Sequence, residues 1–129
     1  MNIASNPKGV HKPLGYYTHT IKIPRESDWL VLSGQVGFDA RGRLASGIRK
    51  QAEQTFKNIL AGLREHGMAK KDLVKFTVYL TDSRFIEEYR VARRRIIGDA
   101  TKPTSTLLIV QGLAAPDLLI EIEAWAAKG

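Results

Sequence analysis

Two segments near the end of the chain decide the fold. They are Lys102-Pro103-Thr104-Ser105-Thr106-Leu107-Leu108-Ile109-Val110 and Ile120-Glu121-Ile122-Glu123-Ala124. Both are rich in β-branched and apolar residues, which favours β-strands. Glu121 and Glu123 alternate with apolar residues, so we expect both carboxylates on one face of their strand. Consecutive apolar residues in Leu107–Val110 and Leu118–Ile120 predict that both faces of these strands are covered.

The sequence before these segments predicts three more strands and two helices. Strands are expected at Tyr17–Ile23, Trp29–Val36 and Leu73–Leu80. A first helix is expected between an N-cap at Ser46 and a stop at Gly67. A second helix should follow Thr81-Asp82-Ser83 and place on one face Phe85, Tyr89, Ala92 and Ile96.

The order β-β-α-β-α-β-β predicts an α+β domain in two layers, with two helices on one mixed sheet. We expect a single domain over residues 1–129, in which residues 1–14 form an N-terminal extension. One face of the sheet would lie under the helices. The other carries apolar residues that a monomer rarely leaves exposed, so the pattern predicts association through the sheet.

Composition excludes several classes of site. The 129 residues include no cysteine, which excludes disulfides, thiolate zinc sites and a cysteine nucleophile. The chain's three histidines, His11, His19 and His66, have no ligand partners at metal spacing, so we predict no metal, and nothing calls for a cofactor. No apolar stretch suits a signal peptide or a membrane span, and we therefore expect a cytoplasmic protein.

The net charge of +7 raises the question of an anionic partner. The densest basic cluster is Arg90, Arg93, Arg94 and Arg95, which spreads over a wide arc of the second helix. Apart from Tyr89, no aromatic residue is interleaved with it for base stacking. A solvated helix face is therefore the favoured interpretation, with attraction of small anions as an alternative and nucleic acid as the least favoured.

The two C-terminal segments resemble the closing part of the reactive-intermediate deaminases, the RidA or YjgF-like family. The family pattern there is Pro-Ala-Arg-Ser/Thr, a strand, and Glu-Ile-Glu-Ala. Further similarity extends from about Gly15 to Trp125 and includes Gly15–Ile21, Ser33-Gly34-Gln35-Val36, Gln51, Gln54, Thr55, Asn58 and Asp72–Val78. The resemblance implies a chorismate-mutase-like fold and a homotrimer with clefts at the subunit boundaries. It also implies a small carbonyl- or imine-like ligand.

The resemblance assigns roles to individual positions. It places catalysis on Glu121, which would hold the attacking water, and on Ser33. It places substrate binding on Tyr17, Ser105, Thr106 and Tyr89. Three positions depart from the family pattern: Ser105 stands where the family has an arginine, Tyr89 where it has an asparagine, and Ala92 where it has a tyrosine.

The serine at position 105 changes the expected chemistry. A guanidinium binds a substrate carboxylate through two parallel hydrogen bonds, whereas a serine hydroxyl offers one neutral donor. We therefore expect a hydrolase of the imine or enamine deaminase type with altered substrate choice. A non-catalytic, ligand-binding trimer is the alternative, and an RNA-binding or endoribonuclease-like protein has less support.

Each assignment has a structural alternative. Glu121 and Glu123 can be solvated or ion-paired, Tyr17 can be an interface aromatic, and Ser33 and Ser105 can satisfy backbone groups. His19, beside Tyr17, can act as a general base or lie at the surface without a role.

Overall fold

The computed structural model describes residues 1–129, the whole chain. Its strands are β1 (Ile3–Ser5), β2 (Thr20–Lys22), β3 (Asp28–Gln35), β4 (Leu73–Leu80), β5 (Thr104–Ile109) and β6 (Ile120–Lys128). Its α-helices are α1 (Gly47–Glu65) and α2 (Ile86–Ile96), and short 3-10 turns precede β4 and α2. Neither helix has the combined length and apolarity needed to cross a membrane.

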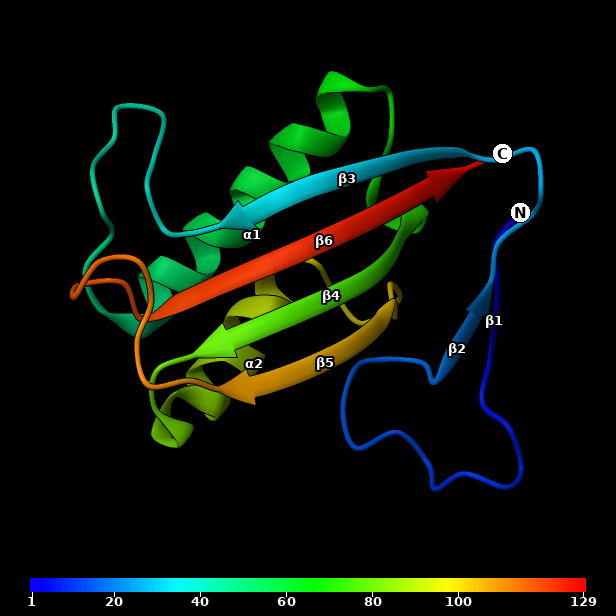
Figure 1. Cartoon of the computed structure of the whole chain (residues 1–129), viewed down its shortest axis with the longest axis horizontal. Helices are drawn as coiled ribbons and strands as arrows, with labels where there is room; N and C mark the ends of the chain where they lie inside the picture. The colour runs from blue at the N-terminus through cyan, green and yellow to red at the C-terminus, as the bar shows by residue number, and fades with distance from the viewer.

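The main sheet has the strand order β3-β6-β4-β5. β4 and β5 are parallel, and the other two pairs are antiparallel, so the sheet is mixed. A parallel pair needs a long crossover connection, which α2 provides between β4 and β5. Both helices lie behind the same face of the sheet (Figure 1). The predicted α+β fold, with two helices on a mixed sheet, is confirmed.

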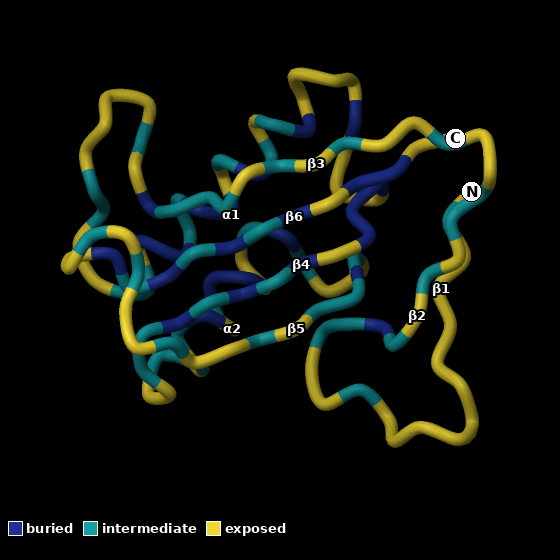
Figure 2. The backbone as a smooth tube through the Cα atoms, in the orientation of Figure 1, coloured by how far each residue is buried: buried dark blue, intermediate teal, exposed yellow.

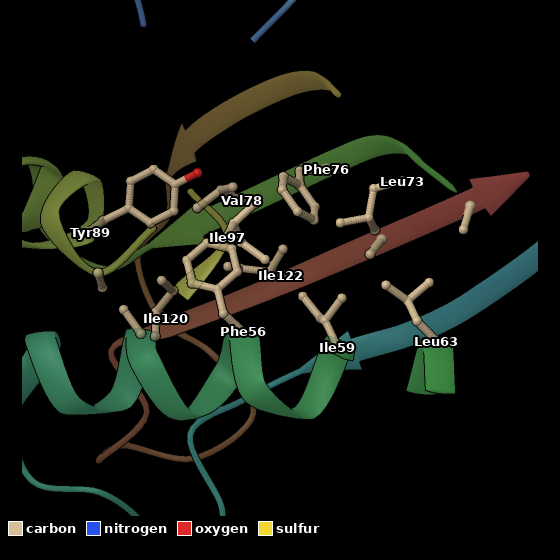
Figure 3. Packing of buried hydrophobic residues seen from close by; sticks show 14 of the residues in the cluster. Phe56, Ile59, Leu63, Leu73, Phe76, Val78, Tyr89, Ile97, Ile120 and Ile122 are labelled. Carbon is tan, nitrogen blue, oxygen red and sulfur yellow. The ribbon is translucent and has the colours of Figure 1, made fainter. Parts of the chain in front are cut away.

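The core lies between the helices and this sheet face. Helical spacing directs Phe56, Ile59 and Leu63 of α1 toward the sheet, where Phe76 and Ile122 meet them (Figure 3). All five side chains are buried. Alternate residues of β4 and β6 point into this cluster, so their neighbours along each strand must point to the opposite face, which we call the open face.

The helix boundaries agree closely with the sequence. α1 begins after its N-cap Ser46, and Gly67 follows its end with a positive φ of 67° that glycine adopts without strain. The second helix starts later than expected, because residues Ser83–Phe85 first form a 3-10 turn. Asp82 stabilises this turn by accepting a 2.9 Å hydrogen bond from the Arg84 N–H.

The first predicted strand lies outside the main sheet. Residues Tyr17–Ile23 were expected to form a strand of that sheet, but only Thr20–Lys22 is a strand, and it pairs with β1 in a separate two-stranded sheet. We call residues 1–23 the arm, and Figure 2 shows that most of it is exposed. Side-chain bonds specify this local pairing: the Asn6 carboxamide oxygen accepts from the His19 N–H at 2.8 Å, and the Thr20 hydroxyl donates to the Ser5 carbonyl at 3.0 Å. Alternation in the sequence did not reveal this partner strand.

The open face carries large apolar side chains, as expected, although most of them lie outside Leu107–Val110 and Leu118–Ile120, the segments that suggested it. Trp29 and Val31 on β3 are 52% and 59% exposed, and Leu108 on β5 is 44% exposed. Trp125 on β6 packs edge-to-face on Trp29 with ring centroids 6.0 Å apart. A face of this character is typical of a surface that another protein chain covers.

Candidate functional site

Three of the predicted site residues meet in a pocket beside the edge strand β5. Its volume is about 210 Å³, and its walls come from the arm, from α2 and from β5. Tyr17 belongs to the arm, Tyr89 and Arg90 to α2, and Ser105 and Leu107 to β5. We call this cavity the β5 pocket. It contains neutral hydroxyl groups and guanidinium groups, and no carboxylate lines it.

The strand register explains why Ser105 faces this pocket. Ser105 pairs with Phe76 of β4, a core residue, and residues paired in a ladder share one face of the sheet. Ser105 therefore lies on the helix side at the sheet edge. Thr106, the next residue, is exposed and pairs with Thr77 on the open face. The two residues predicted to bind the same substrate thus lie on opposite faces of β5.

Tyr89 connects the core to the β5 pocket. Its ring is 5% exposed and packs on Phe56, with centroids 5.9 Å apart. Burial raises the pKa of Tyr89 to about 12, against the opposing effects of Arg93, the nearby Ser105 hydroxyl and Arg90. At neutral pH the phenol is therefore protonated and can donate a hydrogen bond to a ligand.

Arg93 lines the same pocket but is occupied by backbone carbonyls. It is 3% exposed and donates to the carbonyls of Gly98 at 2.8 Å, Tyr16 at 2.9 Å and Thr101 at 2.5 Å. These bonds tie the arm and the loop before β5 to α2. Burial lowers the pKa of Arg93, whose charge is balanced by these carbonyls and not by a carboxylate. We assign Arg93 a structural role.

Two further predicted residues, Glu121 and Ser33, form a second group on the open face, at the other side of the sheet. Glu121 lies on β6 opposite Tyr79 of β4, and next to it β3 bulges between Leu32 and Gln35. The bulge contains Ser33 and Gly34, and Ser33 is exposed. A Cβ atom at position 34 would lie 2.8 Å from the carboxyl carbon of Glu121, so glycine leaves room for the carboxylate in this position and a larger residue would displace the end of the Glu121 side chain.

The two glutamates of β6 have different environments. Glu123 accepts a 2.5 Å hydrogen bond from the Tyr79 hydroxyl, and this bond, together with burial, raises the pKa of Tyr79. Glu121 has no hydrogen bond or ion pair with another side chain. Glu121 is therefore the carboxylate that is free to bind a water or a ligand.

One chain does not bring the two groups together. Ser33 and Ser105 lie on the two edge strands of the four-stranded sheet, which three strand spacings place about 14 Å apart. They also face opposite sides of the sheet. The residues that the sequence predicted as one site thus lie in two separate groups, which we call half-sites: the β5 pocket and the group formed by Ser33, Gly34 and Glu121.

His19 belongs to neither half-site. Its ring packs edge-to-face on Tyr17 at 5.6 Å and on His11 at 5.0 Å, and its Nε2 lies 2.6 Å from the His11 carbonyl. These contacts organise the arm. No three His, Asp or Glu side chains gather in the arrangement that a metal ion would need.

The sequence analysis missed two functional candidates. Gly34 was named only as part of the segment Ser33-Gly34-Gln35-Val36, yet its missing Cβ leaves space for the Glu121 carboxylate. Arg90 was grouped with the other arginines of α2, although it directly follows Tyr89, a position already singled out. Only the structure separates it from its neighbours, because the pairing of each arginine depends on residues distant in sequence.

Comparisons with known proteins cover almost the whole chain. The sequence profile of the family described as "Endoribonuclease L-PSP" matches residues 9–128. A RutC family protein of Pyrococcus abyssi is 34% identical over 119 residues, which cover 91% of this chain and 90% of that protein. A RutC family protein of Aquifex aeolicus is 31% identical over 118 residues, covering 90% and 91%.

Solved structures show the same similarity. A Yersinia pestis protein of unknown function from the conserved Rid family superposes with a TM-score of 0.86, at 26% identity and 98% coverage of both chains. RidA from an Antarctic Psychrobacter superposes with a TM-score of 0.71, at 27% identity, covering 96% of this chain and 98% of that one.

Proposed function

The chain belongs to the RidA/YjgF-like, or endoribonuclease L-PSP, family, and on this premise we propose that it is a small-molecule hydrolase of the imine or enamine deaminase type. The observation that carries the proposal is the free carboxylate of Glu121, which Gly34 accommodates and no other side chain neutralises. An unpaired carboxylate beside an accessible surface can act as a general base toward water.

We further propose that the protein acts as a homotrimer. The open face leaves large apolar side chains uncovered, and the predicted site is divided into two half-sites on different sides of the sheet. Packing of one subunit on the next would cover the apolar face. It would also bring Glu121 of one subunit to the β5 pocket of its neighbour, which completes a cleft at each boundary.

In such a cleft each half-site has a distinct task. The hydroxyl groups of Tyr89 and Ser105 hold the ligand by donating hydrogen bonds. Glu121 takes a proton from a water as the water oxygen bonds to the imine carbon, and it returns that proton to the nitrogen as the C=N double bond becomes single. The hydroxyl proton of the tetrahedral intermediate then moves to the amine nitrogen, the C–N bond breaks as the C=O bond forms, and ammonia and a carbonyl compound leave with Glu121 again ionised.

Ser105 is the reason to expect an altered substrate choice. It supplies one neutral hydroxyl at the position where the resemblance places a guanidinium. Removing a charge-assisted pair costs about 2–4 kcal/mol, or a factor of about 30–1,000 in transition-state binding. The pocket must therefore orient its substrate through other groups.

The test of the proposal is direct. Imines of several amino acids and of uncharged amines would be generated in solution, and their decay followed with and without protein. A protein-dependent decrease in half-life for at least one of them is the expected result. No acceleration of any imine, together with measurable binding of the product carbonyl compounds, would replace the hydrolase by the non-catalytic ligand-binding trimer.

An RNA-directed activity has less support from the structure. Three of the four arginines of α2 are already engaged: Arg93 by carbonyls, Arg94 by Asp99 at 3.8 Å and Arg95 by Glu53 at 3.7 Å. Each of these contacts lowers the positive charge that α2 offers to phosphates. RNA retention that falls steeply with salt would be required to support an RNA-directed function.

A further inference from the structure

Arg90 is the unpaired arginine of α2. It is exposed, it lines the β5 pocket, and it forms no salt bridge and no hydrogen bond with another residue. Its neighbours on the helix are each held by a carbonyl or a carboxylate. A guanidinium with no partner at the wall of a cavity is free to bind an anion.

The surroundings of Arg90 favour a negative ligand. No carboxylate lines the β5 pocket, and Arg93 adds a second positive charge to its wall. The nearest acidic groups on the same helix are Glu88, which pairs with Arg49 at 2.7 Å, and Glu87, which is exposed and does not line the pocket. Asp99, whose charge acts on Arg93, pairs with Arg94 and does not line the pocket, so no carboxylate in the pocket wall pairs with Arg90.

Neutral donors surround the same space. Burial keeps the Tyr89 phenol protonated, and Ser105 places a second hydroxyl beside it. The Tyr17 hydroxyl accepts a 3.1 Å hydrogen bond from the Leu14 N–H, so its own proton remains available. A guanidinium and three hydroxyls match the several lone pairs of a carboxylate.

The size of the pocket limits the ligand. A volume of about 210 Å³ corresponds to the share of about seven water molecules. A carboxylic acid of three or four carbons with one further polar group fits this volume. A nucleotide, with more than twice as many heavy atoms, would extend beyond the pocket.

We propose that Arg90 binds the carboxylate of a small monoanionic substrate in the β5 pocket, so that the charged clamp is supplied by α2 and not by β5. This inference rests on the proposed function and deepens it, because it assigns the side chain that would select a monoanionic substrate in a pocket without the β5 arginine. Leu107, on the remaining wall, would face the apolar end of such a molecule.

Binding is tested with a matched pair of probes. The parent protein is titrated with 2-oxobutanoate and with its neutral amide, 2-oxobutanamide, by calorimetry. We expect the acid to bind more tightly than the amide. Arg90→Gln should weaken binding of the acid by about 10–100-fold and leave the amide unchanged, and Arg90→Lys should recover part of the loss. A parent that does not prefer the acid, or an Arg90→Gln variant that binds the acid as tightly as the parent, would overturn the inference.

Arg95→Gln is the control variant. It removes the same charge from the same helix, but Arg95 pairs with Glu53 and does not line the pocket. Binding of the acid should be unchanged in this variant. An equal loss in Arg95→Gln and Arg90→Gln would show a general effect of net charge and would also overturn the inference. Thermal melting of each variant verifies that the fold is intact.

Hydrolysis separates this inference from the proposed function. If the parent hydrolyses the imine of the acid and that of the amide equally well, the hydrolase stands and the role of Arg90 is rejected. If neither imine is hydrolysed but the titrations give the expected pattern, the hydrolase is rejected and Arg90 remains the anion-binding residue.

Discussion

The open face and the β5 pocket each contain a tyrosine, but the charged groups around the two tyrosines have opposite signs. Each has a tyrosine with a raised pKa: Tyr79 because it donates to Glu123 and is partly desolvated, and Tyr89 because it is buried in the core. The open face carries the two glutamates of β6, whereas the pocket carries arginines and no acid. The sheet separates Glu121 from Arg90 within one chain, so the two side chains do not form a salt bridge with each other there.

The largest expected effect concerns the half-site that contains Glu121. Glu121→Gln keeps the shape of the side chain and removes its ability to accept a proton, so imine hydrolysis should fall by about 10²–10⁴-fold in kcat. Because Glu121 is only half-buried and has no side-chain partner, the melting temperature should hardly change. Stopped-flow decay of the imine measures the rate.

Glu123→Gln is the matched control, two residues away on the same strand face. Its carboxylate is occupied by Tyr79, so the substitution should leave the rate near that of the parent. Equal losses in both variants would mean that the face needs negative charge in general and that Glu121 is not a specific base.

Mixing two impaired variants tests whether the two half-sites of a cleft belong to different subunits. Glu121→Gln damages one half-site and Arg90→Gln the other. When subunits of the two are mixed in equal amounts, unfolded and refolded together, about a quarter of the clefts combine two intact halves in a cyclic trimer. Activity on the carboxylate imine should therefore return to about a quarter of the parent value.

Mixtures no more active than the sum of the two variants would show that each cleft is built within one chain. Light scattering on the parent, with the mass of 14.4 kDa per chain as the unit, establishes independently whether a trimer exists. A stable monomer at micromolar concentration would remove the basis of the mixing experiment and of the proposed cleft.

Sequence reasoning succeeded where local periodicity determines the outcome. Alternation placed Glu121 and Glu123 on one face, and helical spacing with Ser46 and Gly67 fixed the limits of α1. Such patterns depend on the geometry of a single element and need no knowledge of the partner.

Sequence reasoning failed where the structure depends on contacts between residues distant in sequence. The pairing of Thr20–Lys22 with Ile3–Ser5 is specified by Asn6 and Ser5 through side-chain contacts that no periodicity reveals. The engagement of Arg93 by Tyr16, 77 positions away in the chain, is equally invisible to a pattern. One wrong expectation could have been avoided from the sequence alone. Ser105 and Thr106 are consecutive in a strand, so their side chains cannot both face one pocket.

A smaller effect, on the free energy of unfolding, separates Arg93, which we assign a structural role, from Arg90, which we propose binds the ligand. Arg93→Met leaves three carbonyls without their donor and should lower the free energy of unfolding by about 2–3 kcal/mol. Arg90→Gln should change it by less than about 0.5 kcal/mol, because Arg90 is exposed and unpaired. Urea denaturation followed by circular dichroism compares the two variants. Similar losses of stability in both variants would contradict a structural role for Arg93 and a binding role for Arg90.

The smallest expected effect distinguishes Tyr89 from Tyr79 through the stability of the fold at alkaline pH. The folded pKa of Tyr89 is about 12, above the value of about 10 expected for an unfolded chain. Its contribution to stability is therefore fully present below pH 10 and is lost as the pH rises toward 12. Between pH 10 and pH 11 the parent should lose about 1 kcal/mol more than a Tyr89→Phe variant, which keeps the ring on Phe56 and has no proton to release.

One further substitution tests whether the raised pKa values of Tyr79 and Tyr89 have different causes. Glu123→Gln removes the carboxylate that raises the pKa of Tyr79, so titration of tyrosinate absorbance should show one phenol moving toward pH 10. Tyr89 should not move, because burial against the core raises its pKa and Glu123 lies on the other face of the sheet. A shift of the most alkaline phenol in Glu123→Gln would mean that the two faces are coupled electrically through the sheet. The electrostatic separation of Glu121 from Arg90 in a single chain would then be weaker than the geometry indicates.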